Sequence, residues 1–368
     1  MRRIVHVAGA RPNFMKVAPM MRELSKYPHQ FEQLLLHTGQ HYDDNMSRVF
    51  FEDLVLPNPD IYLGVGSGSH AQQTARIMLA CEPVLMKHRP DLVIVVGDVN
   101  STLACALTAA KLGIKVAHLE SGLRSFDRTM PEEINRRLTD HIADLLFTTE
   151  PSANENLCRE GIDSERIHFV GNLMIDMLVQ QLPKANERWN TIYSNLKFRS
   201  KTRDLEHCVL VTLHRPSNVD EVEKLRKIMQ ALVDIAQEVP VIFPVHPRTR
   251  SRMENAGEKI EYSNLIILNP LGYLDFLALM SHATLVVTDS GGIQEETTYL
   301  GVPCLTLRNT TERPITITQG TNELVNLETV RQHIDKIMDG TWKKGKVPEM
   351  WDGKSAERIV NVLLRQVD

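Results

Sequence analysis

Short runs of apolar residues recur along the chain, and longer polar stretches with helical character separate them. Strands rich in valine, isoleucine and leucine that alternate with helices are typical of parallel sheets covered on both faces. Two sets of such runs therefore predict two doubly wound α/β domains. The first set reads RIVHVAGA, QLLLHTGQ, DLVIVVGD, KVAHLE, DLLFTTE and RIHFVGN, and the second reads CVLVTLHR, PVIFPVHP, LIILNP, TLVVTDS and PCLTLRN.

The segment between the two sets is polar and charged, and it reads QLPKANERWNTIYSNLKFRSKTRDLEH. We place the connection between the domains within residues 172–206. A length of 368 residues also suggests two domains, at roughly 150 residues each. The predicted domains are residues 1–172 and 173–350. Residues 351–368 contain SAERIVNVLLRQVD, whose apolar spacing predicts a final amphipathic helix that packs back on the first domain.

Polar and charged residues follow directly after these apolar runs. In open parallel sheets, ligands bind beyond the carboxyl ends of the strands, so these residues are the first candidates for a site. Their number predicts a deep polar cleft between the two domains, although some of the side chains should only cap helices. The candidates at strand ends are Arg11, Gln40, His41, Asp98, Glu120, His214, Arg215, His246, Arg248 and Ser290 with its glycines.

The stretch TDSGGIQEE follows an apolar run and begins a segment with helical character. A helix N-terminus offers unpaired N–H groups and about half a positive charge, and glycine lets an anion approach the backbone. A tight strand-to-helix turn would use the same residues. We predict that Ser290, Gly291 and Gly292 hold a diphosphate. Glu296, a turn further on, would then accept hydrogen bonds from a ribose, and Arg313 in RNTTERP is a further phosphate candidate.

Three carboxylates of the first half follow apolar runs or begin a helix. Asp98 ends VVGD, Glu120 ends HLE, and Glu132 follows Pro131, a favoured first residue of a helix. Carboxylates in a partly dry site can take up a proton and return it. Taken alone, each acid could equally well be a helix cap or a charge that stabilises the start of a helix. Together they favour acid/base chemistry.

Cationic side chains accompany these acids. GARPNFMKVAP places Arg11 after the first run and Lys16 within the following helical segment. Two cations near a helix N-terminus predict an anion or acid between them, or a salt bridge to a neighbouring loop. VTLHRPSN and PVHPRTR place His214, Arg215 and His246 after two later runs, where imidazole and guanidinium suit phosphate oxygens. A structural role is the alternative, above all for His246.

Composition and charge argue against several other partners. The 42 basic and 46 acidic residues leave a net charge of −4 without a long block of one sign, so neither nucleic acid nor a membrane is expected. No apolar segment approaches the ~20 residues of a membrane span, and the first run is too short for a signal peptide, which predicts a cytoplasmic protein. The 5 cysteines lack a C-x-x-C pair, and H-E-x-x-H is absent, so no metal is expected. The absence of G-x-G-x-x-G argues against a nicotinamide cofactor.

Several motifs occur in the order found in a known family: GARPNFMKVAP, GDVNSTLA, HLESGLRS, MPEEINR, HR, PVHPR, TDSGGIQEE and TERP. As an ordered set they resemble the non-hydrolysing UDP-N-acetylglucosamine 2-epimerases. The resemblance implies the GT-B fold, with two Rossmann-like domains and UDP held mainly by the second. It also implies interconversion of UDP-GlcNAc and UDP-ManNAc through UDP and a 2-acetamidoglucal. No cofactor is then required, and we expect a homodimer that serves cell-surface polysaccharide synthesis.

The resemblance and the residue chemistry together assign roles to individual residues. The acid/base carboxylates would be Asp98, Glu120 and Glu132, and His214 would be a further catalytic group. Phe276, in GYLDFLALM, would lie near the uracil. The expected substrate-binding residues are Arg11, Lys16, Arg215, His246, Phe276, Ser290, Gly291, Gly292, Glu296 and Arg313.

Three motifs depart from the commonest spelling of that family. The family's GTRPE is GARPN in this chain, with Asn13 in place of glutamate. The family's HRREN is HRPSN here, and its ERPE is ERPI. These spellings resemble a branch that includes epimerases of UDP-2,3-diacetamido-glucuronate, so such a modified sugar is an alternative substrate. A GT-B glycosyltransferase is a second alternative, but it would need an acceptor groove and usually one base. A non-catalytic nucleotide-sugar binding protein is a third, in which buried acids would be costly.

Overall fold

The chain divides into two compact units. The computed structural model describes residues 1–39, 56–199, 207–255 and 264–366. One unit comprises Met1–Val179 together with Glu349–Asp368, and the other comprises Gln180–Pro348. The described part of the predicted connection forms a helix, α7, which spans Leu173–Arg199 and contains the division between the units.

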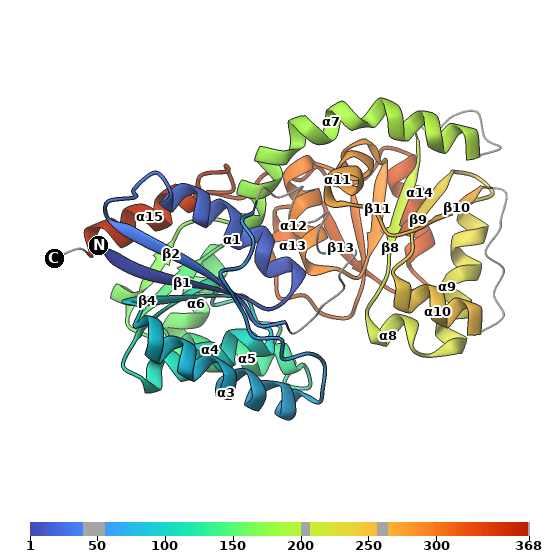
Figure 1. Ribbon diagram of the computed structural model, residues 1–368. Coiled ribbons are helices and arrows are strands. Elements are labelled where there is room, and N and C mark those ends of the chain that lie inside the picture. The colour runs from blue at the N-terminus through green and yellow to red at the C-terminus, as the bar shows by residue number, and fades with distance from the viewer. Residues whose placement is uncertain (40–55, 200–206, 256–263, 367–368) are drawn as a thin grey trace. The chain divides into compact units, whose positions relative to one another are not determined.

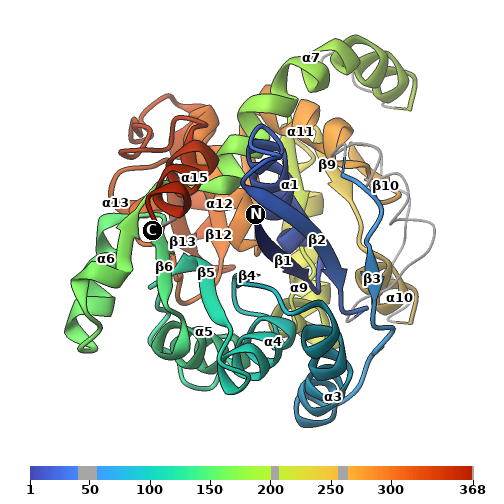
Figure 2. The same cartoon turned by 60° about the vertical axis from the view of Figure 1, so that its left-hand side comes forward.

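The first unit is built on a seven-stranded parallel sheet in the order β3-β2-β1-β4-β5-β6-β7. All residues of the central strand β4 are buried, because helices cover both faces of the sheet. Figures 1 and 2 show α1 and α15 over one face and α3, α4 and α5 over the other. The strands are β1 Arg2–Ala8, β2 Phe31–His37, β3 Ile61–Tyr62, β4 Leu92–Val96, β5 Lys115–Ser121, β6 Leu145–Thr148 and β7 Ile167–Phe169. The helices are α1 Arg11–Leu24, α3 His70–His88, α4 Asn100–Lys111, α5 Pro131–Ile142, α6 Pro151–Arg159, η1 Ser164–Arg166 and α15 Ser355–Arg365.

The second unit is built on a six-stranded parallel sheet in the order β10-β9-β8-β11-β12-β13. The strands are β8 Val209–Thr212, β9 Val241–Pro244, β10 Leu265–Leu268, β11 Leu285–Thr288, β12 Cys304–Leu307 and β13 Asn322–Val325. The helices are α8 Pro216–Val219, α9 Val222–Ile235, α10 Pro247–Asn255, α11 Tyr273–His282, α12 Gly291–Leu300, α13 Ile315–Thr318 and α14 Val330–Met338.

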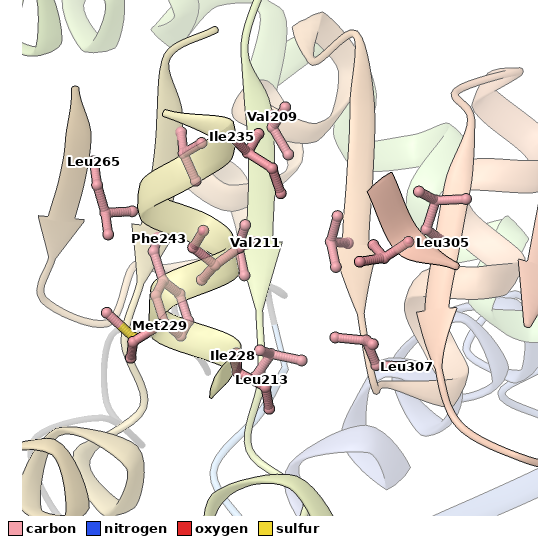
Figure 3. Packing of buried hydrophobic residues seen from close by; sticks show 14 of the residues in the cluster. Val209, Val211, Leu213, Ile228, Met229, Ile235, Phe243, Leu265, Leu305 and Leu307 are labelled. Atoms are coloured by element: carbon pink, nitrogen blue, oxygen red, sulfur yellow. The ribbon is translucent and has the colours of Figure 1, made fainter. Parts of the chain in front are cut away.

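The apolar stripe of α9 packs on the sheet of the second unit. Figure 3 shows Ile228, Met229 and Ile235 of this helix beside Val211 of β8 and Phe243 of β9. All of these side chains are buried, and they belong to one hydrophobic cluster. Burial of such side chains, at roughly 1.5–3 kcal/mol each, is the main force that orders the strands and so positions the loops at their ends.

Each apolar run identified in the sequence forms a strand, and both sheets are parallel, as predicted. Two further strands were not predicted. Ile61–Tyr62 is a two-residue strand at the sheet edge, and Asn322–Val325 mixes polar and apolar residues. Edge strands need no continuous apolar run, because the sheet covers them on one side only. Within the described residues, no helix is long and apolar enough to cross a membrane.

The helix α15 is joined to the first unit by buried polar contacts. The carboxylate of Asp176, at the start of α7, accepts hydrogen bonds from the backbone N–H groups of Ser355 at 3.0 Å and Ala356 at 2.7 Å. The indole of Trp351 donates to the Thr149 carbonyl at 2.9 Å. Gly171 has φ +94°, and a Cβ there would lie 2.1 Å from the Met350 carbonyl oxygen, so only glycine permits this approach.

We expect Asp176→Ala to lower the free energy of unfolding by about 1–3 kcal/mol, because two buried N–H donors at the start of α15 would lose their acceptor. Urea denaturation followed by circular dichroism measures the change. The matched control is Asp352→Ala, which removes a half-exposed partner of Arg358 and should cost less than about 1 kcal/mol. Equal losses in the two variants would contradict a capping role for Asp176.

Candidate active site

The strand order of the first unit reverses between β1 and β4, and ligands in doubly wound sheets bind at the carboxyl ends of strands beside such a reversal. The β1–α1 turn is closely packed there. A Cβ on Gly9 would lie 2.2 Å from Oγ of Ser101, so a larger residue would displace the N-terminus of α4. Oδ1 of Asn13 accepts from the N–H groups of Gly9 and Ala10, and its Nδ2 donates to the Val96 carbonyl at 3.1 Å. Asn13, noted in the sequence only as a departure, therefore ties the end of β1 to the end of β4.

The two predicted cations of this region differ in their surroundings. Arg11 is the first residue of α1 and is exposed, whereas Lys16 is only 6% exposed. The ammonium group of Lys16 forms an ion pair with Glu120, and the two side chains are equally buried. The acid beside Lys16 is thus Glu120.

Glu120 has an unusual backbone conformation. Its φ is +67°, a left-handed value that costs a non-glycine residue of order 1–3 kcal/mol. The pairing of β5 with β6 shifts register between Leu119 and Ser121, on either side of it. Oε2 of Glu120 lies 3.3 Å from the position of a Cβ on Gly97, the residue before Asp98. The strained conformation therefore turns the Glu120 carboxylate toward the end of β4.

Asp98 is held by residues of α5. Its Oδ2 lies 2.5 Å from Nη2 of Arg136, whose Nη1 lies 2.5 Å from Oε2 of Glu133. The same Glu133 oxygen accepts from the N–H and the hydroxyl of Ser125, each at 2.9 Å. The Asn135 amide donates to the Asp98 carbonyl at 2.9 Å. Sequence reasoning missed these partners, although the spacing of Glu133 and Arg136 by one helical turn was visible in MPEEINR.

Glu132 lies in the first turn of the same helix, after Pro131. It is half-buried, whereas the neighbouring Glu133 is 1% exposed and enclosed by its hydrogen bonds. Of the two glutamates, Glu133 therefore has a structural role, in which it binds Ser125 and Arg136. The three predicted acids come from the ends of β4 and β5 and from the start of α5.

The sheet of the second unit reverses its order between β8 and β11, and a buried carboxylate lies at that point. Asp289 accepts hydrogen bonds from the N–H groups of His214 at 3.1 Å and Arg215 at 2.9 Å, and from the Asn218 amide at 3.1 Å. Nδ1 of His214 is 3.0 Å from Oδ1 of Asp289. Burial alone would raise the pKa of Asp289, but the bonds from His214, Arg215 and Asn218 outweigh it and hold the pKa below its ordinary value.

The ionised Asp289 orients His214. A carboxylate can only accept, so Nδ1 of His214 carries a proton and Nε2 is the nitrogen left for a ligand. The His214 side chain is 44% exposed, and its ring centroid lies 6.2 Å from that of His246, which is also exposed. Sequence reasoning missed Asp289, which follows directly after an apolar strand and so carried the same signal as Asp98.

The N-terminus of α12 lies beside cationic side chains. Ser290 is the N-cap residue, and among the described residues no side chain caps this helix, whose first residues Gly291 and Gly292 are half-buried. A Cβ on Gly291 would lie 2.4 Å from Nη1 of Arg313, so the guanidinium rests on the helix start. Arg313 itself forms ion pairs with Glu295, at 2.9 Å, and Glu312.

Two further arginines belong to this cluster. Burial lowers the pKa of Arg215, and the neighbouring charges of Arg308 and Arg313 lower it further. Arg308 pairs with Glu312 at 2.8 Å, but its buried Nη1 has no hydrogen-bond partner among the described residues. Three guanidinium groups gathered beside a helix N-terminus suit an anion such as a phosphate.

The remaining candidates of the second unit lie on α11 and α12, which pack together. The Tyr273 hydroxyl donates to Oε1 of Glu296 at 2.7 Å, and both side chains are buried. Burial, together with the charge of Glu296, raises the pKa of Tyr273 well above its ordinary value, so the phenol stays a donor. Phe276 is half-buried one turn along α11. Gln40 and His41 lie outside the described residues.

The chain matches the family model described as UDP-N-acetylglucosamine 2-epimerase over residues 22–364. It belongs to this epimerase family. It is 44% identical over 367 residues to the UDP-N-acetylglucosamine 2-epimerase of Methanococcus maripaludis and 45% identical over 364 residues to that of Methanocaldococcus jannaschii, with 97% of each chain covered in both alignments. The structure of the M. jannaschii epimerase in complex with UDP-GlcNAc and UDP matches with a TM-score of 0.88 at 42% identity, covering 99% of both chains.

A second named activity occurs in the epimerase family. The UDP-2,3-diacetamido-2,3-dideoxy-D-glucuronate 2-epimerase of Pseudomonas aeruginosa is 38% identical to this chain over 374 residues, with 99% of both chains covered. The family resemblance and the fold class predicted from the sequence are confirmed.

We expect the Asp289 carboxylate to contribute stability at neutral pH that is lost in acid. Because its folded pKa lies below the unfolded value of about 4, the contribution is full above ~pH 4 and disappears as the pH falls through the folded pKa. Asp289→Asn should lower the unfolding free energy by about 1–3 kcal/mol at neutral pH and flatten its decline in acid. Urea denaturation at several pH values measures both. The exposed Asp335→Asn is the control, and an unchanged acid slope in Asp289→Asn would contradict the assignment.

Proposed function

We propose that this protein is a non-hydrolysing UDP-sugar 2-epimerase, an isomerase that interconverts UDP-GlcNAc and UDP-ManNAc. One observation carries the proposal. Asp98 and Glu120 end adjacent parallel strands, and each is held by a separate buried cation, Arg136 for the first and Lys16 for the second. Inversion at C2 needs a proton taken from one face of the sugar and a proton delivered to the other, which separately held carboxylates can divide between them.

The proposed reaction balances without an oxidant. A carboxylate takes the C2 proton, the C–H electron pair forms a C1=C2 double bond, and the C1–O bond electrons leave with UDP. The product is a 2-acetamidoglucal. In the return step a carboxylic acid delivers a proton to the opposite face of C2, and the UDP oxygen bonds to C1 again. Asp98, Glu120 and Glu132 are the proposed acid/base groups.

The second unit would hold and stabilise the UDP. The N–H groups of Gly291 and Gly292 would bind the diphosphate together with the hydroxyl of Ser290, whose own N–H donates to the Thr288 hydroxyl at 3.0 Å. The partial positive charge of the helix would support this binding. His214 would present Nε2 to the departing UDP oxygen, with its ring oriented by Asp289.

The other predicted residues complete the proposed substrate site. Glu296, with its Tyr273 partner, would bind the ribose hydroxyls, and Phe276 would contact the uracil. The arginines add positive charge that favours UDP as a leaving group. The proposed substrate-binding groups besides the α12 N-terminus are Arg11, Lys16, Arg215, His246, Phe276, Glu296, Arg308 and Arg313.

A modified sugar such as UDP-2,3-diacetamido-glucuronate is the second candidate substrate. It is supported by the HRPSN and GARPN spellings and by the relative from P. aeruginosa. The higher identity to relatives named for UDP-N-acetylglucosamine favours the simpler sugar. Incubation of the purified protein with each UDP-sugar and no acceptor separates the two, and it also tests for a glycosyltransferase, which would leave both unchanged. The homodimer and the role in polysaccharide synthesis rest on the resemblance, and the cytoplasmic location rests on the hydropathy of the sequence.

Gly291→Val should weaken UDP binding at least tenfold while the protein stays folded, because the added side chain occupies the place of the Arg313 guanidinium. Isothermal titration calorimetry measures the affinity. Gly301→Ala, at the other end of α12, is the matched control, since a Cβ there meets nothing within 4 Å although φ is +73°. It should lose some stability but no UDP affinity. An unchanged affinity in Gly291→Val would rule out the phosphate site at this helix.

The wild-type protein in D₂O should place deuterium at C2 of both substrate and product. Asp98→Asn, Glu120→Gln and Glu132→Gln should each keep UDP affinity and lose about 10² to 10⁴ in kcat, the usual contribution of an acid/base group. Mass spectrometry and NMR of the sugars measure the exchange, with the exposed Glu82→Gln as control. If the product kept its original C2 hydrogen, the elimination route would be excluded.

A further inference from the structure

His118 lies in the middle of β5 and is fully buried, with hydrogen-bond acceptors at both ring nitrogens. Nδ1 lies 2.6 Å from Oδ1 of Asp140, and Nε2 lies 2.8 Å from the carbonyl oxygen of Gly97. A carbonyl oxygen only accepts, so Nε2 must carry a proton. The protonation state of the ring then depends on whether the other proton belongs to Nδ1 or to Asp140.

The surroundings of Asp140 decide this question. Its second oxygen accepts from Nη1 of Arg124 at 2.7 Å and from the N–H of Gly122 at 3.1 Å. Burial alone would raise the pKa of Asp140, but the charges and hydrogen bonds of His118 and Arg124 outweigh it and hold the pKa below its ordinary value. The guanidinium of Arg124 and the N–H of Gly122 stabilise Asp140 as a carboxylate whatever the state of His118, so Asp140 only accepts and the proton between the two groups belongs to Nδ1. His118 is an imidazolium that donates two hydrogen bonds.

His118 donates a hydrogen bond to Gly97, the residue directly before Asp98, and so affects where the Asp98 side chain lies. Gly97 begins the turn that follows β4 and has φ +65°. Its N–H donates to the Leu119 carbonyl at 3.0 Å, and its own carbonyl accepts from His118. Both backbone polar groups of Gly97, the residue directly before Asp98, are thus held by β5. The same short segment of β5 continues into Glu120, whose left-handed conformation brings its carboxylate beside Gly97.

We propose that His118 is a positioning residue for the proton transfers, acting through the Gly97 carbonyl on Asp98 and through the β5 backbone on Glu120. This role rests on the proposed function. A neutral imidazole could donate to only one of the two acceptors. Loss of the Nε2 donor would leave the Gly97 carbonyl buried without its partner. The turn before Asp98 could then rotate and move the Asp98 carboxylate. A misplacement of a catalytic group by about 1 Å can lower a rate roughly 10²-fold.

The first experiment tests the charge of His118 without any assay of activity. In protein labelled with ¹⁵N-histidine, NMR at neutral pH should show both ring nitrogens of His118 protonated, and the signal is assigned by its disappearance in His118→Gln. A wild-type ring whose Nε2 carries no proton would overturn the proposal, because the bond to the Gly97 carbonyl could not form. This result does not depend on the reaction, so the proposed function can fail while the imidazolium is observed.

The second experiment compares two variants that each keep one of the two donors. The side-chain amide of glutamine reaches the place of Nε2, and that of asparagine reaches the place of Nδ1. His118→Asn keeps a donor to Asp140 but not to Gly97, so its kcat should fall roughly 10²-fold with UDP affinity unchanged. His118→Gln keeps the donor to Gly97, so its kcat should stay within about tenfold of the wild type.

A merely structural role predicts a different order. If His118 served only to balance the charge of Asp140, the asparagine variant would retain more kcat than the glutamine variant, and that order would overturn the proposal. Equal kcat in both variants would overturn it as well. His6→Gln is the matched control, since His6 is a fully buried histidine of β1 whose Nε2 bonds Gln33. It should lose stability without a change in kcat.

Discussion

Buried carboxylates that accept backbone N–H groups are the interaction on which this structure depends. A carboxylate removed from water is stable only when it is paired and hydrogen-bonded, so each one enforces the conformation of the loop that supplies its donors. Asp289 does this for the turn after β8, and Asp140 for the turn after β5. Glu133 holds Ser125, and Asp176 holds the first turn of α15. The loops at the strand ends are therefore determined by charge as well as by packing.

These ion pairs are better understood as positioning devices than as sources of stability. Taking two charges out of water costs several kcal/mol, and their attraction only offsets that cost when the geometry is good. The Lys16–Glu120 pair adds a further cost, because Glu120 is held in a left-handed conformation. The hydrophobic clusters of both sheets stabilise the fold and so offset the free-energy cost of these ion pairs. Strain at such a residue is typical of a functional site.

The two units meet different chemical demands with the same architecture. In the first, the strand ends carry acids that are each held by a cation, which suits the movement of protons. In the second, a helix N-terminus lies beside a cluster of arginines, which suits an anion. Asp289, the residue before the N-cap Ser290, pairs with His214 beside this helix. The division follows from which side chains occupy the strand ends, since both sheets have a reversal of strand order.

The sequence by itself determined the two parallel sheets and where to look for the site. Strands covered on both faces must be apolar throughout, so their runs are visible without any knowledge of the fold, and so are the residues that follow them, such as Asp98, Glu120 and His214. The edge strand Ile61–Tyr62 was not visible, because burial on one side leaves no such run. Asp289 could have been predicted in the same way as Asp98, because it too follows directly after an apolar run.

Only the tertiary structure decided which groups partner the site residues. Arg136 pairs with Asp98, and His118 bonds Gly97, although the partners lie far apart in the sequence. No local sequence pattern indicates such contacts. The reason is physical: a hydrogen bond depends on the register of neighbouring strands and on the direction of a side chain, and both are set when the sheet closes and its helices pack. The charge of His118 likewise follows from two acceptors that meet only in the folded chain.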